Sequence, residues 1–368
     1  MITRLLIIGG YGNFGRLIAK RLATEKNIQL IIAGPHLEKA QLLSKELLAH
    51  NQIESAQINI HHQLEQSLKE IKPDIVIHTS GPYQIQGYEV AKACIKQGCH
   101  YIDLADARDF VVGITQLNNQ AQANNLLICS GASSVPCLAN AIINHYQSEF
   151  AKITDLDYAI ATAQLTNNGL ATTTAGLSYA GKPFNTLRNG KAKIIYGWQD
   201  LRRRKFWGLG TRFLGNCDIP DLLLFPKRYP DLINIRFQAG LELTFLHLIL
   251  WAFSGLVKNK LFPDLAKFAP QMLKISRLFD IFGTDDSGFY LEIKGLDKDG
   301  KPACKLFEIY AQHGDGLYIP CIPAIILSKK LAKNTIETVG ALPCLDLISL
   351  EEYLDELKSF DIEWSESP

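Results

Sequence analysis

Apolar residues in the first third of the chain form short continuous runs, and segments of mixed polarity and helical length separate them. Such runs are typical of buried parallel strands, which alternate with helices in α/β proteins. Because Leu17, Ile18 and Leu22 recur at helical spacing after the first run, we expect a helix to follow it directly. This order predicts a Rossmann-type doubly wound parallel sheet. The six predicted strands lie at residues 5–8, 29–33, 56–60, 74–78, 100–103 and 126–129.

Beyond residue 135 the pattern changes to an alternation of apolar and polar residues, as in "ITDLDYAIATA" at 153–163. Alternation of this kind indicates a strand with one buried face. Further strands are expected at 233–243 and on both sides of a turn at 297–301 within 287–312. A sheet built from these segments is mixed, so we predict an α+β second domain.

The chain length and composition fit two globular domains. The chain has 368 residues, of which 47% are hydrophobic and 20% are charged, whereas one domain typically has about 150 residues. We expect the doubly wound domain over 1–134 and the α+β domain over 135–339. Near the C-terminus, Ser349 and Glu352 have the spacing of a capping box, which predicts the start of a helix.

Charge and cysteine usage narrow the class of protein. The formal net charge of +1 produces no long-range attraction to nucleic acid, so no nucleic-acid partner is expected. The eight cysteines include neither a C-x-x-C pair nor a Cys/His cluster at zinc spacing. The start of the sequence lacks the pattern of a secretory signal. We therefore expect a cytoplasmic protein without a structural metal.

A glycine-rich stretch, "IIGGYGNFGR", joins the first predicted strand to the first predicted helix. Gly10, Gly12 and Gly15 complete the pattern G-x-G-x-x-G. In this pattern the first glycine permits a tight turn, the second admits a pyrophosphate and the third allows close helix packing. The helix N-terminus, with Asn13 and Phe14 in its first turn, would hold the phosphate charge. The alternative is a purely structural turn, but the surrounding strands and helices favour dinucleotide binding.

Small and polar residues follow three further predicted strands, in "HTSGPYQ", "YIDLAD" and "CSGASSVP". In doubly wound sheets, ligands bind beyond the carboxyl ends of the strands. Ser80, Gly81 and Pro82, which follow the fourth strand, are therefore candidate cofactor contacts. The same edge of the sheet would receive the nicotinamide and the substrate.

The end of the second predicted strand indicates which dinucleotide is bound. NAD-binding enzymes usually carry Asp or Glu about 20 residues after the glycine motif, where it bonds the ribose hydroxyls. This chain has Ala33, Gly34, Pro35 and His36 there. A 2′-phosphate would meet no carboxylate at these positions, which favours NADP over NAD, with His36 and Lys39 as cationic partners. Alternatively, His36 and Lys39 belong to a solvated helix start.

Three stretches of the chain resemble the saccharopine dehydrogenase superfamily, including its carboxynorspermidine dehydrogenase branch. They are "GGYGNFG", "TSGPYQIQGYEVAKACIKQGCHYIDLAD" and "GASSVPCLANA". Two later stretches, "FGTDDSGFYLEIKGLDKDGKPACKLFEIYAQHGDGLYIPCIPA" and "GALPCLDLISLEEYLDEL", are similar to the second domain and C-terminal return of bacterial members. The chain departs from the family at "AGP", where "AGR" is expected, so the usual cationic contact to NADP is missing at this position.

The resemblance implies a reversible reductive amination. A hydride moves between C4 of nicotinamide and the carbon of a C=N bond, so that a secondary amine linking two metabolites is made or broken. The substrate would be an amino-acid or polyamine adduct, bound by the domain at 135–339. The resemblance also implies that 340–368 packs back on the domain at 1–134 and that the protein is a homodimer.

Such a reaction requires a polar residue that manages one proton near the strand ends. Asp103, which ends the strand in "HYID", is the first candidate and would hold the substrate ammonium or iminium. The alternative is a surface or helix-capping aspartate. Tyr83 is the second candidate, as a hydrogen-bond donor beside the nicotinamide, with packing at a domain interface as its alternative. His78, His100 and His313 are weaker candidates for a general acid.

Three other features have both a structural and a functional interpretation. Tyr88 and Lys92 match the Y-x-x-x-K spacing of short-chain dehydrogenases, but they follow the fourth strand rather than the fifth, which favours coincidence. The basic run 202–205 is interpreted as a solvated loop rather than as a site for anions or a membrane. The glycines of "HGDGLYIP" at 313–320 make that stretch a candidate lid, with a plain loop as the alternative.

The stretch "LTFLHLILWAFSGLV" at 243–257 contains no formal charge. A membrane-spanning helix needs about 20 apolar residues, so a core or dimer-interface helix is the first interpretation and weak membrane contact is the second. The helix predicted at 265–282 is amphipathic and basic, which keeps surface association open. Two alternatives to the dehydrogenase follow, namely a membrane-associated lipid-modifying reductase and a non-catalytic NADP-binding sensor.

Overall fold

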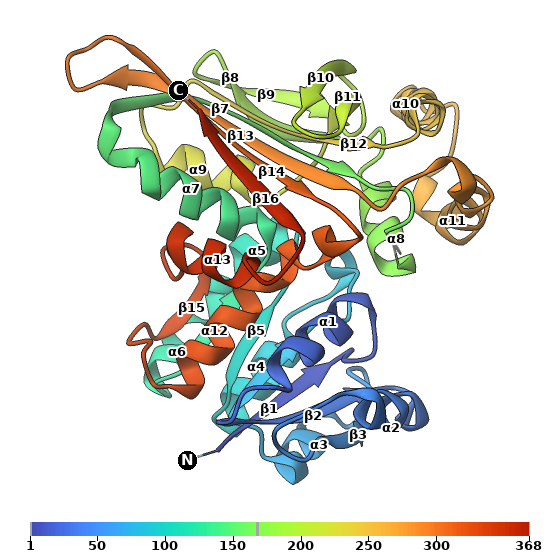
Figure 1. Cartoon of the computed structure of the whole chain (residues 1–368), viewed down its shortest axis with the longest axis vertical. Coiled ribbons are helices and arrows are strands. Elements are labelled where there is room, and N and C mark those ends of the chain that lie inside the picture. The colour runs from blue at the N-terminus through green and yellow to red at the C-terminus, as the bar shows by residue number, and fades with distance from the viewer. Residues whose placement is uncertain (1, 167–168, 368) are drawn as a thin grey trace. The chain divides into compact units, whose positions relative to one another are not determined.

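The computed structural model describes residues 2–166 and 169–367, which form two compact units (Figure 1). The first unit consists of Met1–Leu138 and Tyr318–Glu356, and the second of Ala139–Leu317 and Leu357–Pro368. The ends of the predicted domain ranges, residues 1 and 368, lie outside the described part of the chain. The chain leaves the first unit after residue 138 and returns at 318, compared with predicted boundaries after 134 and at 340.

A parallel sheet of seven strands, in the order β15-β6-β5-β4-β1-β2-β3, forms the centre of the first unit. Leu5, Leu6 and Ile7 are fully buried, as expected for a parallel sheet with helices on both faces. The predicted doubly wound sheet is therefore confirmed. The strands are β1 (Thr3–Ile8), β2 (Ile28–Gly34), β3 (Glu54–Gln57), β4 (Ile75–His78), β5 (His100–Asp103), β6 (Leu127–Ser130) and β15 (Gly340–Pro343).

Helices connect these strands and cover the sheet (Figure 1). α1 (Asn13–Leu22) buries Gly15, Ile18, Ala19 and Leu22, which recur at helical spacing. α12 (Ile322–Ala332) contacts α1, so a segment from late in the chain completes this layer. The remaining helices are α2 (Leu37–Glu46), α3 (Leu64–Ile71), α4 (Glu89–Gln97), α5 (Arg108–Gly113), α6 (Asn118–Ala123) and α13 (Leu350–Leu357), with the short turns η1 (Tyr83–Ile85), η2 (Ile114–Leu117), η3 (Ser134–Leu138) and η8 (Ile319–Cys321).

The C-terminal segment divides between the two units. β15 pairs in parallel with β6, and α13 begins with the predicted capping box. The Ser349 N–H donates to Glu352 Oε2 at 2.9 Å, and the Glu352 N–H donates to Ser349 Oγ at 3.1 Å. β16 (Ile362–Ser367), however, pairs with β14 (Pro302–Ala311) of the second unit. We expected all of 340–368 to pack on the first domain, but the last strand forms hydrogen bonds along the edge of the second sheet.

A mixed sheet of seven strands, in the order β10-β11-β12-β7-β13-β14-β16, forms the centre of the second unit. β7 and β12 are parallel, whereas the other pairs are antiparallel, which confirms the predicted mixed sheet. The run 202–205, expected as a loop, belongs to the strand β10 because it pairs with β11. The remaining strands are β7 (Phe150–Thr162), β10 (Arg202–Phe206), β11 (Gly210–Asn216), β12 (Asn234–Leu241) and β13 (Ser287–Asp297), with β8 (Pro183–Arg188) and β9 (Lys191–Tyr196) in a separate hairpin.

The helices of the second unit lie on the sheet and beyond its end (Figure 1). In α10 (Thr244–Lys258), the buried residues are His247, Leu250 and Ser254. The core interpretation of 243–257 therefore does not hold, since most of this helix reaches the surface. No helix in the described part of the chain is long and apolar enough to cross a membrane. The other helices are α7 (Ala139–Tyr146), α8 (Leu170–Ser178), α9 (Asp221–Arg228) and α11 (Ala269–Arg277), with the turns η4 (Gln147–Glu149), η5 (Leu265–Phe268), η6 (Asp280–Phe282) and η7 (Asp315–Leu317).

The capping box of α13 generates a stability prediction. Ser349→Ala removes the hydroxyl that accepts from the Glu352 N–H, so we expect the free energy of unfolding of the first unit to fall by about 1 kcal/mol in urea denaturation. Ser349→Thr keeps the hydroxyl and should retain most of that stability. Equal unfolding midpoints for the alanine variant and the unmodified chain would contradict the proposed contribution of this cap.

Candidate functional site

The turn after β1 is held against β2. The N–H groups of Gly9 and Gly10 both donate to the Ala33 carbonyl oxygen, at 2.9 and 3.0 Å. We expected Gly10 to permit the turn, but Gly9 has the left-handed conformation, with a φ of +80°. Gly10 is needed for packing instead, because a Cβ there would lie 2.9 Å from Ile32 Cγ2. In the sequence, the adjacent pair Gly9 and Gly10 was the available signal for this division of roles.

α1 begins directly after this turn. A Cβ on Gly15 would come within 2.3 Å of Gly9 O, which agrees with the packing role expected for the third glycine. Gly12 is the N-cap of α1, and a Cβ there would meet, within 4 Å and among the described residues, only Gly9 O at 3.1 Å. A side chain at Gly12 would therefore make a tight contact with the turn, which glycine avoids. Asn13 and Phe14 place their peptide groups at the positive end of the helix dipole, which attracts anions.

Tyr11 covers the end of β2. Its ring lies so close to Gly34 that a Cβ on Gly34 would be 2.6 Å from Tyr11 Oη. The same oxygen accepts a hydrogen bond from the His36 N–H at 3.0 Å. The His36 imidazole is exposed, with Nδ1 3.7 Å from Glu38 Oε1, and Lys39 is exposed beside them. Sequence reasoning missed Tyr11 and Glu38, although an aromatic residue inside the glycine motif was an available signal.

The loop after β4 packs on the same glycine turn. Thr79 Oγ1 donates to Gly9 O at 3.1 Å, and a Cβ on Gly9 would lie 2.5 Å from Ser80 Oγ. Gly81 and Pro82 follow, joined by a cis peptide bond. The fold thus brings Ser80 beside the turn, and Gly81 and Pro82 follow it in the same loop. The role of these three residues toward a cofactor stays a prediction.

Tyr83 and His78 form a buried pair below this loop. The Tyr83 hydroxyl donates to the His78 carbonyl oxygen at 2.7 Å, and burial raises the pKa of this hydroxyl well above its usual value. His78 Nε2 lies 3.0 Å from Gln86 Oε1, and burial lowers the pKa of the imidazole to about 4. At neutral pH, His78 is therefore uncharged and the proton of Tyr83 is engaged with the backbone.

Asp103 ends β5 and is completely buried, so it is not the surface aspartate considered above. Its Oδ1 accepts hydrogen bonds from Ala105 N, Ser130 Oγ and Gly131 N, each at 2.9 Å. Its Oδ2 is buried and makes no hydrogen bond to the residues that the structure describes. Burial raises the pKa of this carboxyl to about 6, although the bonds from Gly131, Ala105 and Ser130 lower it. The ends of β5 and β6 therefore hold an acid that titrates near neutral pH.

The other two histidine candidates have different surroundings. His100 is the first residue of β5, at the opposite strand end from Asp103. Its Nδ1 accepts from the Leu127 N–H at 3.0 Å, and burial lowers the pKa of its imidazole. His313 belongs to the second unit, where its exposed imidazole lies 3.1 Å from Asp361 Oδ2. The fold therefore does not bring His100 to the strand end that carries Asp103.

Two further sequence features have structural contacts of their own. The Tyr88 hydroxyl donates to Phe110 O at 2.8 Å, and Lys92 is exposed. This geometry fits the interpretation that the Y-x-x-x-K spacing arises by chance. The candidate lid at 313–320 contains the turns η7 and η8, and Gly314 there has a φ of +78°. Its function as a lid stays a prediction.

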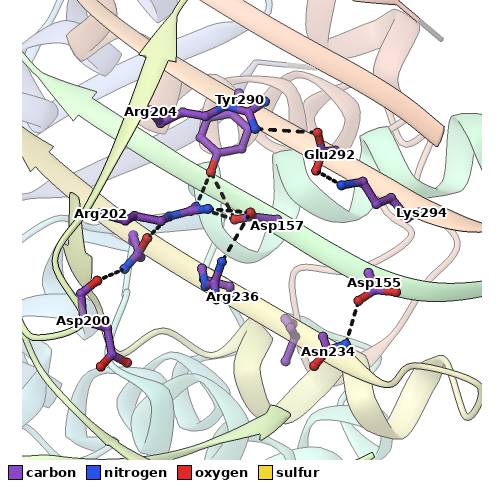
Figure 2. Close-up of polar contacts among 12 residues, drawn as sticks. Asp155, Asp157, Asp200, Arg202, Arg204, Asn234, Arg236, Tyr290, Glu292 and Lys294 are labelled. Atoms are coloured by element: carbon purple, nitrogen blue, oxygen red, sulfur yellow. Dashed lines mark hydrogen bonds and ion pairs between the residues drawn. The ribbon is translucent and has the colours of Figure 1, made fainter. Parts of the chain in front are cut away.

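A polar cluster lies on the sheet of the second unit (Figure 2). Arg202 donates two hydrogen bonds to Asp157, at 2.7 and 2.6 Å, in the bidentate geometry that guanidinium and carboxylate groups favour. Arg202 also donates to Tyr290 Oη and to Gln238 Oε1, while Arg236 lies 3.7 Å from Asp157. The first arginine of the basic run is therefore a partner within the sheet rather than part of a solvated loop.

The neighbouring charges in Figure 2 are matched in a similar way. The Arg204 guanidinium lies over the Tyr290 ring, 4.2 Å from its centroid, and 3.6 Å from Glu292. Lys294 approaches the same carboxylate at 2.7 Å. Burial and the nearby Asp157 raise the pKa of Tyr290. Because these cations share carboxylate partners across strands, the cluster contributes to the pairing of the sheet. The spacing of these residues in the sequence gave no signal for it.

The fold of the whole chain is similar to that of a known dehydrogenase. It matches apo histidine-tagged saccharopine dehydrogenase (L-Glu forming) from Saccharomyces cerevisiae with a TM-score of 0.71 and 12% sequence identity, over 100% of both chains. Amine dehydrogenase from Mycobacterium smegmatis matches with a TM-score of 0.49 and 9% identity, over 93% of this chain and 94% of the other. A mutant of meso-dapdh with DAP from Clostridium tetani E88 matches with a TM-score of 0.44 and 14% identity, over 97% and 98% of the two chains.

The first part of the sequence matches a known domain family. Residues 5–154 match the model described as "Saccharopine dehydrogenase NADP binding domain". No curated protein matches the chain. In the part of the chain that the structure describes, no group of three or more His, Cys, Asp or Glu side chains is arranged to hold a metal ion. The domain match supports an NAD(P)-linked oxidoreductase: residues 5–154 are similar to the NADP-binding domain of saccharopine dehydrogenases, and the whole chain shares the fold of one such enzyme.

Proposed function

We propose that this protein is an NADP-dependent oxidoreductase that transfers a hydride to or from a C=N or CH–NH carbon of an amino-acid or polyamine adduct. The observation that carries the proposal is the glycine turn at the N-terminus of α1, where Gly12 carries no side chain, within a stretch of chain that matches an NADP-binding family. When bound, the nicotinamide supplies or accepts the hydride. The residues of the chain bind the dinucleotide, orient it and manage one proton.

The glycine turn is suited to a pyrophosphate group. Gly10 and Gly15 let β1, β2 and α1 approach one another closely. Gly12, the N-cap of α1, carries no side chain that would stand between the helix N-terminus and a phosphate. Asn13 and Phe14 lie in the first turn of α1, where the helix dipole favours negative charge. Ser80, Gly81 and Pro82 would border the nicotinamide end, since ligands of doubly wound sheets lie beyond the carboxyl ends of the strands.

The preference for NADP rests on the start of α2. His36 and Lys39 are exposed there and would face the 2′-phosphate of the adenosine ribose. Glu38 opposes this preference, because its carboxylate lies 3.7 Å from the His36 imidazole. A bound 2′-phosphate would compete with Glu38 for His36. The difference in affinity between NADP and NAD is therefore expected to depend on Glu38.

Asp103 is proposed to accept the proton that the substrate nitrogen releases. Oxidation of a CH–NH group moves a hydride from carbon to nicotinamide, and the nitrogen gives up a proton as the C=N bond forms. Asp103 Oδ2 has no hydrogen-bond partner among the described residues, and a pKa of about 6 leaves the group mostly ionised and able to accept a proton at neutral pH. Tyr83 would donate toward the nicotinamide only after exchanging its present acceptor, His78 O.

The second unit is proposed to select the substrate and to form a homodimer. Its sheet differs from the first in being mixed and in carrying a cluster of charged side chains (Figure 2). We further propose that the protein works in the cytoplasm. All eight cysteines, which lie in the described part of the chain, are reduced rather than joined in disulfides, and this suits a reducing compartment.

A binding measurement tests the proposed cofactor site. Gly12→Asp puts a carboxylate where the pyrophosphate would lie, so we expect NADPH binding, followed by nicotinamide fluorescence, to weaken by at least about tenfold. Gly176→Asp is the matched control, because a Cβ at Gly176 meets only Tyr179 Oη, at 4.0 Å, among the described residues. Binding of neither NADPH nor NADH to the unmodified chain would overturn the proposed function.

The cofactor preference is tested at Glu38. Glu38→Gln removes the charge beside His36, so we expect the affinity for NADPH to rise about threefold at low ionic strength, with the affinity for NADH unchanged. Glu65→Gln, on the exposed face of α3, is the control for the loss of one surface carboxylate. An equal change for both cofactors would mean that the 2′-phosphate does not lie near His36.

The buried carboxyl of Asp103 generates a pH prediction. Its pKa is raised in the folded protein, so the folded state binds this proton more tightly than the unfolded chain and gains stability at low pH. We expect the free energy of unfolding, relative to Asp103→Asn, to decrease by up to about 3 kcal/mol as the pH rises from about 4 to about 6.5. Urea titrations at each pH measure it, with exposed Asp109→Asn as the control. A difference that is constant with pH contradicts the raised pKa.

A further inference from the structure

α10 presents apolar side chains on both of its faces. His247, Leu250 and Ser254 are buried. On the opposite face Phe245, Ile249, Ala252 and Leu256 follow at intervals of three or four residues and are exposed. A surface helix normally carries polar or charged residues on its outer face. The outer stripe of α10 is therefore an unpartnered apolar surface.

The segment after α10 extends this apolar surface. The rings of Phe245 and Phe279 lie 4.9 Å apart, which joins α10 to the end of α11. Phe262 links Phe253 and Phe268 in the same way, with ring centroids 5.1 and 5.6 Å from theirs. Figure 1 shows α10 and α11 side by side in the second unit. The outer faces of α10, η5, α11 and η6 together are termed the α10–α11 surface.

The exposed side chains of α11 and η6 are large and apolar. Ile275 and Leu278 are 55% and 70% exposed, and Ile281 and Phe282 are 83% and 65% exposed. Trp251 on α10 is also exposed. Exposed apolar side chains of this size on joined helices suit an interaction site better than ordinary surface.

Positive charge surrounds these apolar residues. The range 244–282 contains five basic residues and two acidic ones. Asp264 is engaged by Lys182 at 2.6 Å, and Asp280 accepts a hydrogen bond from Gln164 at 2.8 Å. The basic residues are all exposed and are Lys258, Lys260, Lys267, Lys274 and Arg277. The α10–α11 surface therefore combines exposed apolar groups with a net positive charge.

We propose that the α10–α11 surface docks on an anionic lipid bilayer, lying in the interface with its apolar side chains among the headgroups. Helices with exposed Trp, Phe and Leu residues and a basic rim have the composition of interfacial membrane anchors. This inference goes beyond the proposed hydride transfer and does not depend on it. The 15 residues of α10 extend about 22 Å, less than the roughly 30 Å of a bilayer core, so the helix lies on the membrane and does not span it.

Charge favours a membrane over a second copy of the chain. A two-fold dimer would place the α10–α11 surface against the same surface of its partner, so that one basic rim would face another. Protein interface cores are also depleted of lysine, whereas each Lys or Arg near an anionic bilayer strengthens binding. The net positive charge of the range 244–282 is thus complementary to acidic headgroups.

Vesicle flotation of the full chain tests the proposal. The vesicles contain phosphatidylcholine, either alone or with about one third phosphatidylserine. We expect flotation with the anionic vesicles only, reduced but not abolished at high salt, because apolar insertion remains when charge is screened. No flotation with anionic vesicles would overturn the proposal. Loss of all binding at moderate salt would also overturn it, since charge alone would then account for the contact.

Paired variants separate the contributions of the surface. Ile275→Ser with Leu278→Ser removes exposed apolar groups, and Lys267→Glu with Lys274→Glu reverses charge. Each pair should lower the floated fraction by at least about fivefold, while the exposed control Leu48→Ser should not. Unchanged flotation of the apolar pair would contradict insertion. NADPH binding should be the same in all variants, so a failed dinucleotide site and a failed docking surface give different results.

Two further measurements test whether Trp251 enters the lipid and whether the surface instead pairs two copies of the chain. Trp251 fluorescence should shift to shorter wavelength with anionic vesicles, and Trp251→Phe should remove that shift. Sedimentation measures the oligomeric state without lipid. If Ile275→Ser with Leu278→Ser converts a dimer to a monomer and no vesicle binding is found, the surface pairs two copies of the chain and the membrane proposal is wrong.

Discussion

The close approach of α1 to the turn after β1 is the constraint on which the first unit depends. A single Cβ on Gly15 would come within 2.3 Å of Gly9 O, so no other residue type fits without moving the helix. The same turn bonds twice to Ala33 on β2 and once to Thr79 after β4. Three strand ends and a helix N-terminus thus meet at one point, with Gly12 as the N-cap of the helix.

The acid at the neighbouring strand end depends on the same parallel order. Asp103 on β5 is completely buried, and its three hydrogen-bond donors come from its own turn and from the end of β6. The strand order brings β6 beside β5, so Ser130 and Gly131 are available to hold one carboxylate oxygen. The result is a carboxyl that titrates near neutral pH, which suits it to accept or return one proton at the edge where the dinucleotide is proposed to bind.

Charged residues have different surroundings in two regions of the second unit. On its sheet, Arg202 pairs with Asp157 of β7, and Arg204 lies beside Glu292 and Tyr290 of β13, so charge there links different strands (Figure 2). Lys294 pairs with Glu292 within β13. On the α10–α11 surface, by contrast, basic residues surround exposed apolar side chains without matching acids of equal number. Charged pairs between strands support the sheet, whereas an excess of basic residues beside exposed apolar groups suits a surface that contacts something outside the chain.

Local patterns in the sequence determined the doubly wound sheet, the glycine motif, the mixed second sheet and the capping box of Ser349 and Glu352, because each depends on residues a few positions apart. Tertiary structure decided the rest. Tyr11 over Gly34, the donors of Asp103, the pairing of β16 with β14 and the strand at 202–205 all join residues distant in sequence. Such contacts depend on strand order and register, which are set when whole elements pack, and periodicity along one segment carries no information about them.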